Sequence, residues 1–171
     1  MDEARFGQQG TLTWVWARKG SRPTAVKQTK YEWVYLYAAV EPSSGESTAL
    51  LAPHVNTGTM SVFLTMLSDD VKQRGSGDDV AVVIMDQAGW HTSKRLEVPE
   101  NLRIVLLPPY SPELNPVENL WQWMRSHRTS NQIFTDYDDL IDGVGGAWRT
   151  LTRKRLRSVC RCSYLTPGNQ S

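Results

Sequence analysis

The chain has the length and composition of one globular domain, because 171 residues with 40% hydrophobic and 22% charged side chains can bury a sizeable core. A net charge of +1 gives no molecule-wide signal for nucleic acid, and two cysteines one residue apart exclude a disulfide framework and a four-cysteine zinc site. With no signal peptide and no apolar run of about 18 residues that could span a membrane, the sequence indicates a reduced, cytoplasmic protein.

The first half of the chain predicts a β-hairpin followed by a helix. Residues 31–40 are rich in aromatic and β-branched side chains, and residues 47–51 return as their partner after the turn at Pro42 to Gly45. Residues 59–74 repeat apolar side chains at helical spacing and end at Gly75.

The second half alternates strands and helices. Residues 80–85 form a continuous apolar run, which is typical of a strand buried on both faces, and a short helical piece is expected at residues 93–96. Residues 102–107 predict the next strand, and a proline-rich loop leads to a helix with Asn115 as its N-cap and Pro116 as its first residue. Another helix follows Thr135, although its glycines weaken it. This order predicts an α/β domain with a mixed sheet flanked by helices.

The end of the chain is basic. Residues 149–161 carry six arginine or lysine side chains, and no acidic residue follows Asp142. A solvated helix face is the ordinary explanation of such a run, and contact with DNA phosphates is the alternative.

Acidic residues stand where a sheet of this kind places its ligands. Asp86 ends the apolar strand, Glu118 lies on the first turn of the helix after the next strand, and Asp2 or Glu3 can supply a third carboxylate. Hard divalent cations prefer oxygen ligands, and two such ions suit phosphoryl transfer. Each residue also has an ordinary structural explanation: a turn for Asp86, a capping box with Asn115 for Glu118, and a solvated terminus for Asp2.

Three segments resemble the motifs of the DDE catalytic domain in mariner-like bacterial insertion-sequence transposases. The resemblance covers residues 2–151. The motifs are Asp2-Glu3-x-Arg5-Phe6, Asp86-Gln87-Ala88-x-x-His91, and residues 111–121, Ser-Pro-Glu-Leu-Asn-Pro-Val-Glu-Asn-Leu-Trp.

The resemblance implies a ribonuclease H-like fold. It also implies that Asp2, Asp86 and Glu118 are the catalytic residues and hold two Mg²⁺ or Mn²⁺ ions. In such an enzyme, water cleaves a strand at the transposon end, and the freed 3′-hydroxyl then attacks target DNA.

The sequence departs from the family pattern in three places. Gln87 replaces an asparagine, and the 31 residues between Asp86 and Glu118 are slightly fewer than usual, as expected of a surface-loop deletion. The upstream helix-turn-helix region and most of the first strand are expected to be missing. The chain therefore resembles the downstream half of a split transposase or a decayed copy, with residues 1–151 as the catalytic domain and 152–171 as a basic C-terminal tail.

Partners and alternatives follow from the same resemblance. DNA is the expected partner, together with a second copy of the chain or an upstream helix-turn-helix polypeptide. Lys19, Arg22, His91 and Arg125 are candidate DNA contacts, against the alternatives of solvated charge and, for His91, of tying down a loop. An inactive remnant that only binds DNA or a full-length transposase, and a ribonuclease H-type nuclease, remain alternative functions. The absence of a phosphate-cradling glycine-rich motif disfavours an ATP-driven enzyme.

Overall fold

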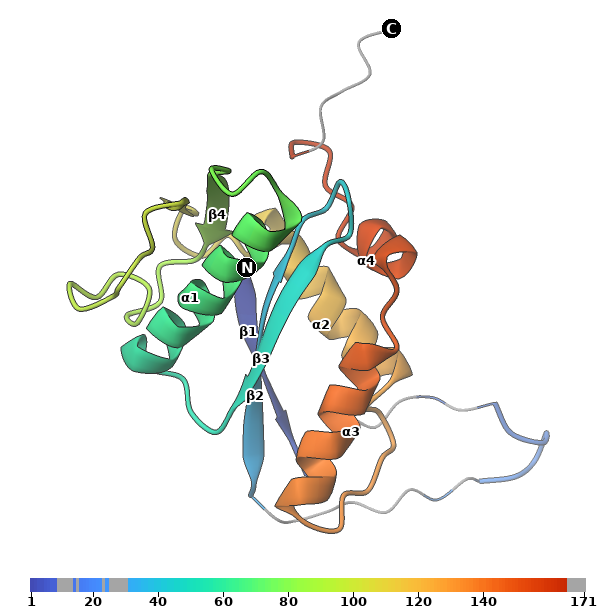
Figure 1. The fold of residues 1–171 in the computed structure, drawn as a ribbon. Helices are drawn as coiled ribbons and strands as arrows, with labels where there is room; N and C mark the ends of the chain where they lie inside the picture. The colour runs from blue at the N-terminus through green and yellow to red at the C-terminus, as the bar shows by residue number, and fades with distance from the viewer. Residues whose placement is uncertain (9–13, 15, 23, 25–30, 166–171) are drawn as a thin grey trace, which may run out of the picture.

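The computed structural model describes residues 1–8, 14, 16–22, 24 and 31–165 (Figure 1). The strands are β1 (Asp2–Gly7), β2 (Trp33–Val40), β3 (Ser47–Ala52), β4 (Ala81–Met85) and β5 (Leu102–Leu106). The helices are α1 (Thr57–Arg74), α2 (Pro116–His127), α3 (Tyr137–Arg149) and α4 (Arg153–Val159), with a short 3₁₀ turn, η1 (Pro112–Leu114), before α2. The mixed α/β order predicted from the sequence is confirmed.

The strands form two sheets that meet at the start of β1. β1, β2 and β3 pair antiparallel in that order, whereas β4 and β5 pair parallel. The amino group of Met1 donates a hydrogen bond of 2.6 Å to the carbonyl of Ile84 in β4. The residue that follows Met1 and the residue that follows β4 are Asp2 and Asp86, so this junction brings the first two acidic motifs to one edge of the fold.

Helices cover both faces of the antiparallel sheet (Figure 1). Because side chains alternate along a strand, Ala4 and Phe6 of β1 face α2, α3 and α4, while Met1 and Tyr37 join the core with α1 and β4. The helix residues that fill the first core are Val117, Leu120, Trp121, Met124, Leu140, Val144 and Leu156. Trp121 and Met124 are at most 1% exposed, so α2 is held in a fixed position against β1.

The first strand, which was expected to be largely missing, is a strand of six residues. It pairs with β2 residue by residue, from Gly7 opposite Trp33 to Asp2 opposite Ala38. Beyond that point Ala39 and Val40 pair with β3. A groove of about 740 Å³ separates this end of β2 from β4.

Two local predictions are wrong. β4 is buried on one face only, because α1 covers Val83 and Met85 whereas Val82 on the other face is 63% exposed. Residues 93–96 form a turn closed by a hydrogen bond from Leu96 to Ser93 and no helix, since four residues ahead of Pro99 are too few to sustain one.

The basic end of the described chain packs onto the core. Leu156 of α4 is 3% exposed and Cys160 is fully buried, and both lie in the core beside α2. The exposed side of α4 carries the arginine and lysine side chains. The division of the chain at residue 151 stays a prediction.

Candidate active site

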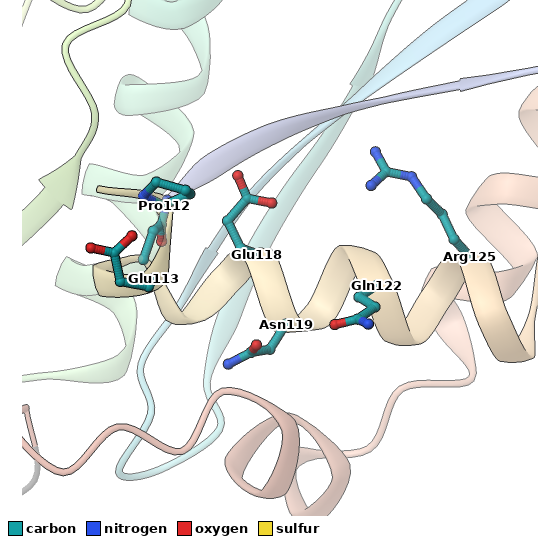
Figure 2. Close-up of a pocket in the computed structure, with 7 residues that line it drawn as sticks. Pro112, Glu113, Glu118, Asn119, Gln122 and Arg125 are labelled. Carbon is teal, nitrogen blue, oxygen red and sulfur yellow. The ribbon is translucent and has the colours of Figure 1, made fainter. Parts of the chain in front are cut away.

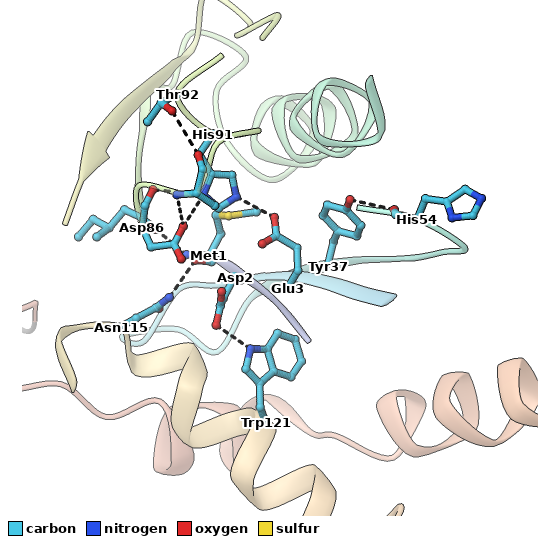
Figure 3. Close-up of polar contacts among 12 residues, drawn as sticks. Met1, Asp2, Glu3, Tyr37, His54, Asp86, His91, Thr92, Asn115 and Trp121 are labelled. Atoms are coloured by element: carbon cyan, nitrogen blue, oxygen red, sulfur yellow. Dashed lines mark hydrogen bonds and ion pairs between the residues drawn. The ribbon is translucent and has the colours of Figure 1, made fainter. Parts of the chain in front are cut away.

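Asp2 is a buried carboxylate held by a tryptophan. The alternation of β1 turns its side chain toward α2, where Oδ2 accepts a hydrogen bond of 2.8 Å from Nε1 of Trp121 (Figure 3). Asp2 is 7% exposed and Trp121 is 1% exposed. Asp2 is therefore a fixed part of the core edge, and the alternative of a frayed, solvated terminus does not describe it.

The negative charge of Glu118 affects the pKa of Asp2. Burial raises the pKa of Asp2 from 3.8 to about 7, and repulsion from the Glu118 carboxylate adds to the increase, while the hydrogen bond from Trp121 opposes it. A cation bound between the two carboxylates would relieve both the burial cost and the repulsion. The structure thus brings two of the three predicted residues into electrostatic contact.

Glu118 stands on the first turn of α2 without acting as a cap. The Asn115 side chain caps the helix by accepting from the Val117 N–H at 3.3 Å, and its own amide donates to the Met1 carbonyl at 3.1 Å. The Asn115 N–H is bonded to the Pro112 carbonyl, so the capping box that was the structural alternative for Glu118 does not form here.

The Glu118 side chain borders a cavity of about 280 Å³ (Figure 2). In Figure 2 the side chains of Glu118 and Arg125 project from the same side of α2, toward β1. The other lining residues are Pro112, Glu113, Asn115, Asn119 and Gln122. The cavity therefore combines carboxylates with one arginine, a group that suits a phosphate.

Asp86 and His91 form a second acidic group on the other side of β1. Oδ1 of Asp86 accepts from the Ala88 N–H at 3.0 Å and lies 2.6 Å from Nδ1 of His91, whose Nε2 lies 2.8 Å from Oε1 of Glu3 (Figure 3). The His91 side chain is fully buried. Burial alone would lower the pKa of His91, but the hydrogen bond and charge of Glu3 and the charge of Asp86 outweigh it and raise the pKa above 6.5.

The four candidate DNA contacts differ in accessibility. Both ring nitrogens of His91 are engaged inside the protein, which supports the loop-fixing role over contact with DNA. Lys19 and Arg22 are exposed, and Arg125 is half-buried with its guanidinium 5.6 Å from the centre of the Phe6 ring.

Oxygen donors of the kind that Mg²⁺ and Mn²⁺ prefer are present in Asp2, Asp86 and Glu118. Asp2 and Glu118 interact, whereas Asp86 lies with His91 and Glu3, and within the described ranges no three acidic, histidine or cysteine side chains form a ready-made metal cluster. The donor chemistry fits a hard cation, and the buried Asp2 with its raised pKa is the observation in its favour.

Three contacts that shape the site are not apparent from the local sequence pattern. The indole N–H of the buried Trp121 holds Asp2, and its position three residues after Glu118 on the same helix was the available signal. The contacts of Glu3 with His91 and of Asn115 with Met1 join residues 88 and 114 positions apart, and no local pattern indicates such pairs.

In the part of the chain that the structure covers, every helix is too short or too polar to cross a membrane.

Comparisons with known proteins identify the family of the chain. A family model described as DDE superfamily endonuclease matches residues 1–141. The uncharacterized protein y4pE/y4sA of Sinorhizobium fredii (strain NBRC 101917 / NGR234) is 44% identical over 119 residues, which are 70% of this chain and 85% of that protein.

Solved structures of a mariner transposase share the fold. A Mos1 transposase paired-end complex with left transposon end matches with a TM-score of 0.67 and 16% identity, covering 93% of this chain and 49% of that one. The Mos1 mariner paired end complex with Mn matches with a TM-score of 0.66 and 18% identity, over 93% of this chain and 50% of that one. The chain thus spans about half the length of the transposase chains that it matches.

The expected ribonuclease H-like fold is confirmed by this likeness, although the strands pair as one antiparallel and one parallel sheet instead of a single mixed sheet. Together with the match to the family model over most of its length, it places the chain in the DDE superfamily of endonucleases.

Proposed function

We propose that the chain is the catalytic domain of a transposase, which cleaves DNA strands and joins them to a target with the help of divalent metal ions. The observation that carries the proposal is the buried Asp2 carboxylate beside Glu118, with its pKa raised to about 7, in a member of a DDE endonuclease family. Without a cation, a carboxylate pair of this kind destabilises the fold through burial and charge repulsion. A bound cation would offset both effects.

Asp2, Asp86 and Glu118 would hold two Mg²⁺ or Mn²⁺ ions. Bound there, the ions would activate the attacking water and stabilise the charge that develops on the phosphodiester. Trp121 fixes Asp2, and the Ala88 N–H and His91 fix Asp86. The complex of the related Mos1 transposase with Mn supports the choice of metal.

DNA is the proposed substrate. The Mos1 structures that share this fold are complexes with transposon ends or a strand transfer complex, which supports a transposon end and a target as the two DNA partners. Arg125 lies at the Glu118 cavity, where its guanidinium can meet a phosphate, and the exposed Lys19 and Arg22 can contact the DNA backbone. Assembly as a homodimer, or with an upstream helix-turn-helix polypeptide, completes the proposal for a protein acting in the bacterial cytoplasm.

The test is nicking of a labelled transposon end in the presence of Mg²⁺ or Mn²⁺. Asp86→Ala and Glu118→Gln are expected to lower the nicking rate at least about a hundredfold. Glu113→Gln is the matched control, because Glu113 lines the same cavity on η1 without belonging to the proposed ligand set. If wild type and Asp86→Ala nick at the same rate, the proposed catalysis is wrong.

The second candidate is a protein that binds DNA or a full-length transposase without cleaving. The observation that favours it is that Asp86 does not join Asp2 and Glu118 in a three-ligand cluster among the described residues. DNA binding that persists without any metal-dependent nicking would support this candidate, and nicking that depends on Asp86 would exclude it.

A further inference from the structure

His91 joins two carboxylates that come from distant parts of the chain. Its Nε2 lies 2.8 Å from Glu3 Oε1 in β1, and its Nδ1 lies 2.6 Å from Asp86 Oδ1 at the end of β4 (Figure 3). The ring is fully buried, and the Glu3 side chain is 5% exposed. The imidazole therefore links β1 to the loop that carries the second acidic motif.

Each contact is short enough to be a hydrogen bond and needs a proton between the ring nitrogen and the carboxylate oxygen. A neutral imidazole carries only one N–H, and its bare nitrogen would repel a carboxylate oxygen at such a distance, so the doubly protonated ring satisfies both partners. Charge-assisted hydrogen bonds of this length are strong, and a buried ion pair that loses one partner is costly. The three side chains consequently hold one another in a fixed geometry.

The hydrogen bonds that the structure gives to the Asp86 carboxylate fall on one oxygen. Oδ1 accepts from the Ala88 N–H and faces His91, while Oδ2 has no hydrogen bond to the described residues. The Asp86 side chain is 56% exposed, in contrast to the buried His91. One oxygen is thus anchored, and the other is left for a ligand from outside.

Glu3 anchors this arrangement from a rigid strand. It follows Asp2 directly, but the pleat of β1 sends the two side chains to opposite faces: Asp2 toward Trp121 and Glu3 toward His91. β1 is held by β2 along its whole length, so Glu3 has little freedom to move.

We propose that Glu3 and His91 are positioning residues, which aim Oδ2 of Asp86 at a divalent cation. Glu3 fixes the ring of His91, and the ring fixes Oδ1 of Asp86. Carboxylates that ligate metals commonly depend on such hydrogen-bonded partners. The proposal rests on the proposed function, because it gives Asp86 the role of a metal ligand.

The first experiment examines the metal-free full chain by NMR of the imidazole ring. Two slowly exchanging ring N–H signals are expected for His91. Glu3→Ala should remove the Nε2–H signal and shift the Nδ1–H signal, because the ring loses its anchor. A single ring N–H signal that Glu3→Ala leaves unchanged would overturn the proposal.

The second experiment measures Mn²⁺ affinity by calorimetry. Glu3→Ala and His91→Ala should each weaken binding about tenfold or more. Glu3→Gln should weaken it less than Glu3→Ala does, since the amide oxygen still accepts the Nε2–H. The double variant should bind as weakly as His91→Ala alone, because Glu3 acts through His91.

Ser68→Ala is the matched control for a loss of stability. Ser68 is 2% exposed and bonds to Asn101, 33 residues away, between α1 and the residue before β5. It should lower the melting temperature but change Mn²⁺ affinity by less than about twofold. If Glu3→Ala and His91→Ala behave like Ser68→Ala, their role is purely structural and the proposal is wrong.

These experiments also distinguish a failure of the proposed metal-dependent function from a failure of the positioning role alone. A wild-type protein that shows both His91 signals but binds no Mn²⁺ would overturn the metal-dependent function, and with it the positioning role, while leaving the hydrogen-bonded link itself established.

Discussion

At the scale of single residues, Asp2 is the side chain of the site whose ionised form is most destabilised by burial. A carboxylate that is 7% exposed loses most of its hydration, and one hydrogen bond from Trp121 does not replace it, since the pKa remains raised to about 7. Asp2 destabilises the metal-free protein at neutral pH. A residue that weakens the fold in this way fits a role in binding a cation.

Asp2→Asn is expected to stabilise the metal-free protein, by an amount that depends on pH. Because folding raises the pKa of Asp2 from 3.8 to about 7, its contribution to stability is complete below pH 3.8 and is lost as the pH rises through about 7. Asparagine keeps the acceptor for Trp121 and never ionises. Its advantage should therefore grow by about 1.4 kcal/mol per pH unit over this range, to at most about 4 kcal/mol, and stay constant above it.

Urea unfolding in a metal chelator, from about pH 5 to about pH 8, measures this difference. The shifted His91 is present in both proteins, so its effect cancels in the comparison. An advantage of Asp2→Asn that is the same at every pH would contradict the assignment.

At the scale of elements, α3 shows how packing outweighs local propensity. Its glycines predict a weak helix, yet residues 137–149 are helical. A Cβ atom built on Gly143 would lie 2.4 Å from the ring of the buried Phe134, while one on Gly146 would meet nothing within 4 Å. Gly143 is needed for the close approach of Phe134, and Gly146 has no such contact.

Substitution by alanine at the two positions is therefore expected to change the free energy of unfolding in opposite directions. Gly146→Ala should raise the free energy of unfolding by about 0.5–1 kcal/mol, because alanine favours the helix. Gly143→Ala should lower it by about 1–3 kcal/mol, because the Phe134 ring must move. Urea unfolding of the wild type and of both variants measures these two changes in the free energy of unfolding. Equal gains at the two positions would show that Phe134 does not pack as the structure has it.

At the scale of the whole molecule, local patterns predicted most elements and long-range contacts shaped the site. The hairpin, α1, β4, β5 and the capped start of α2 follow from periodicity and from Asn115 and Pro116, whereas the six residues of β1 exceed what was expected. The link from Glu3 to His91 could not be predicted, because it depends on how β1 meets β4. The exposed face of β4 was missed for a similar reason: an apolar run shows that a strand is hydrophobic, but not which faces other elements cover.

The distribution of charge belongs to the same scale. The net charge is only +1, but α4 concentrates basic side chains beside α2. Arg153 pairs with Glu46 at 2.6 Å, and Arg155 lies over the Trp123 ring at 5.3 Å. Lys154 and Arg157 are exposed, and the structure gives them no ion pair with a described residue.

These two side chains are the ones on α4 that DNA phosphates can reach without breaking another contact. The variant Lys154→Ala with Arg157→Ala should therefore weaken DNA binding and reduce the slope of log affinity against log salt by about 2, roughly one for each lost phosphate contact. Lys72→Ala on α1, which covers the opposite face of the sheet, should leave the slope unchanged. Fluorescence anisotropy with a labelled duplex over a series of salt concentrations measures both slopes. Equal slopes for the wild type and the α4 variant would mean that DNA does not contact α4, and that its charges are an ordinary solvated helix face.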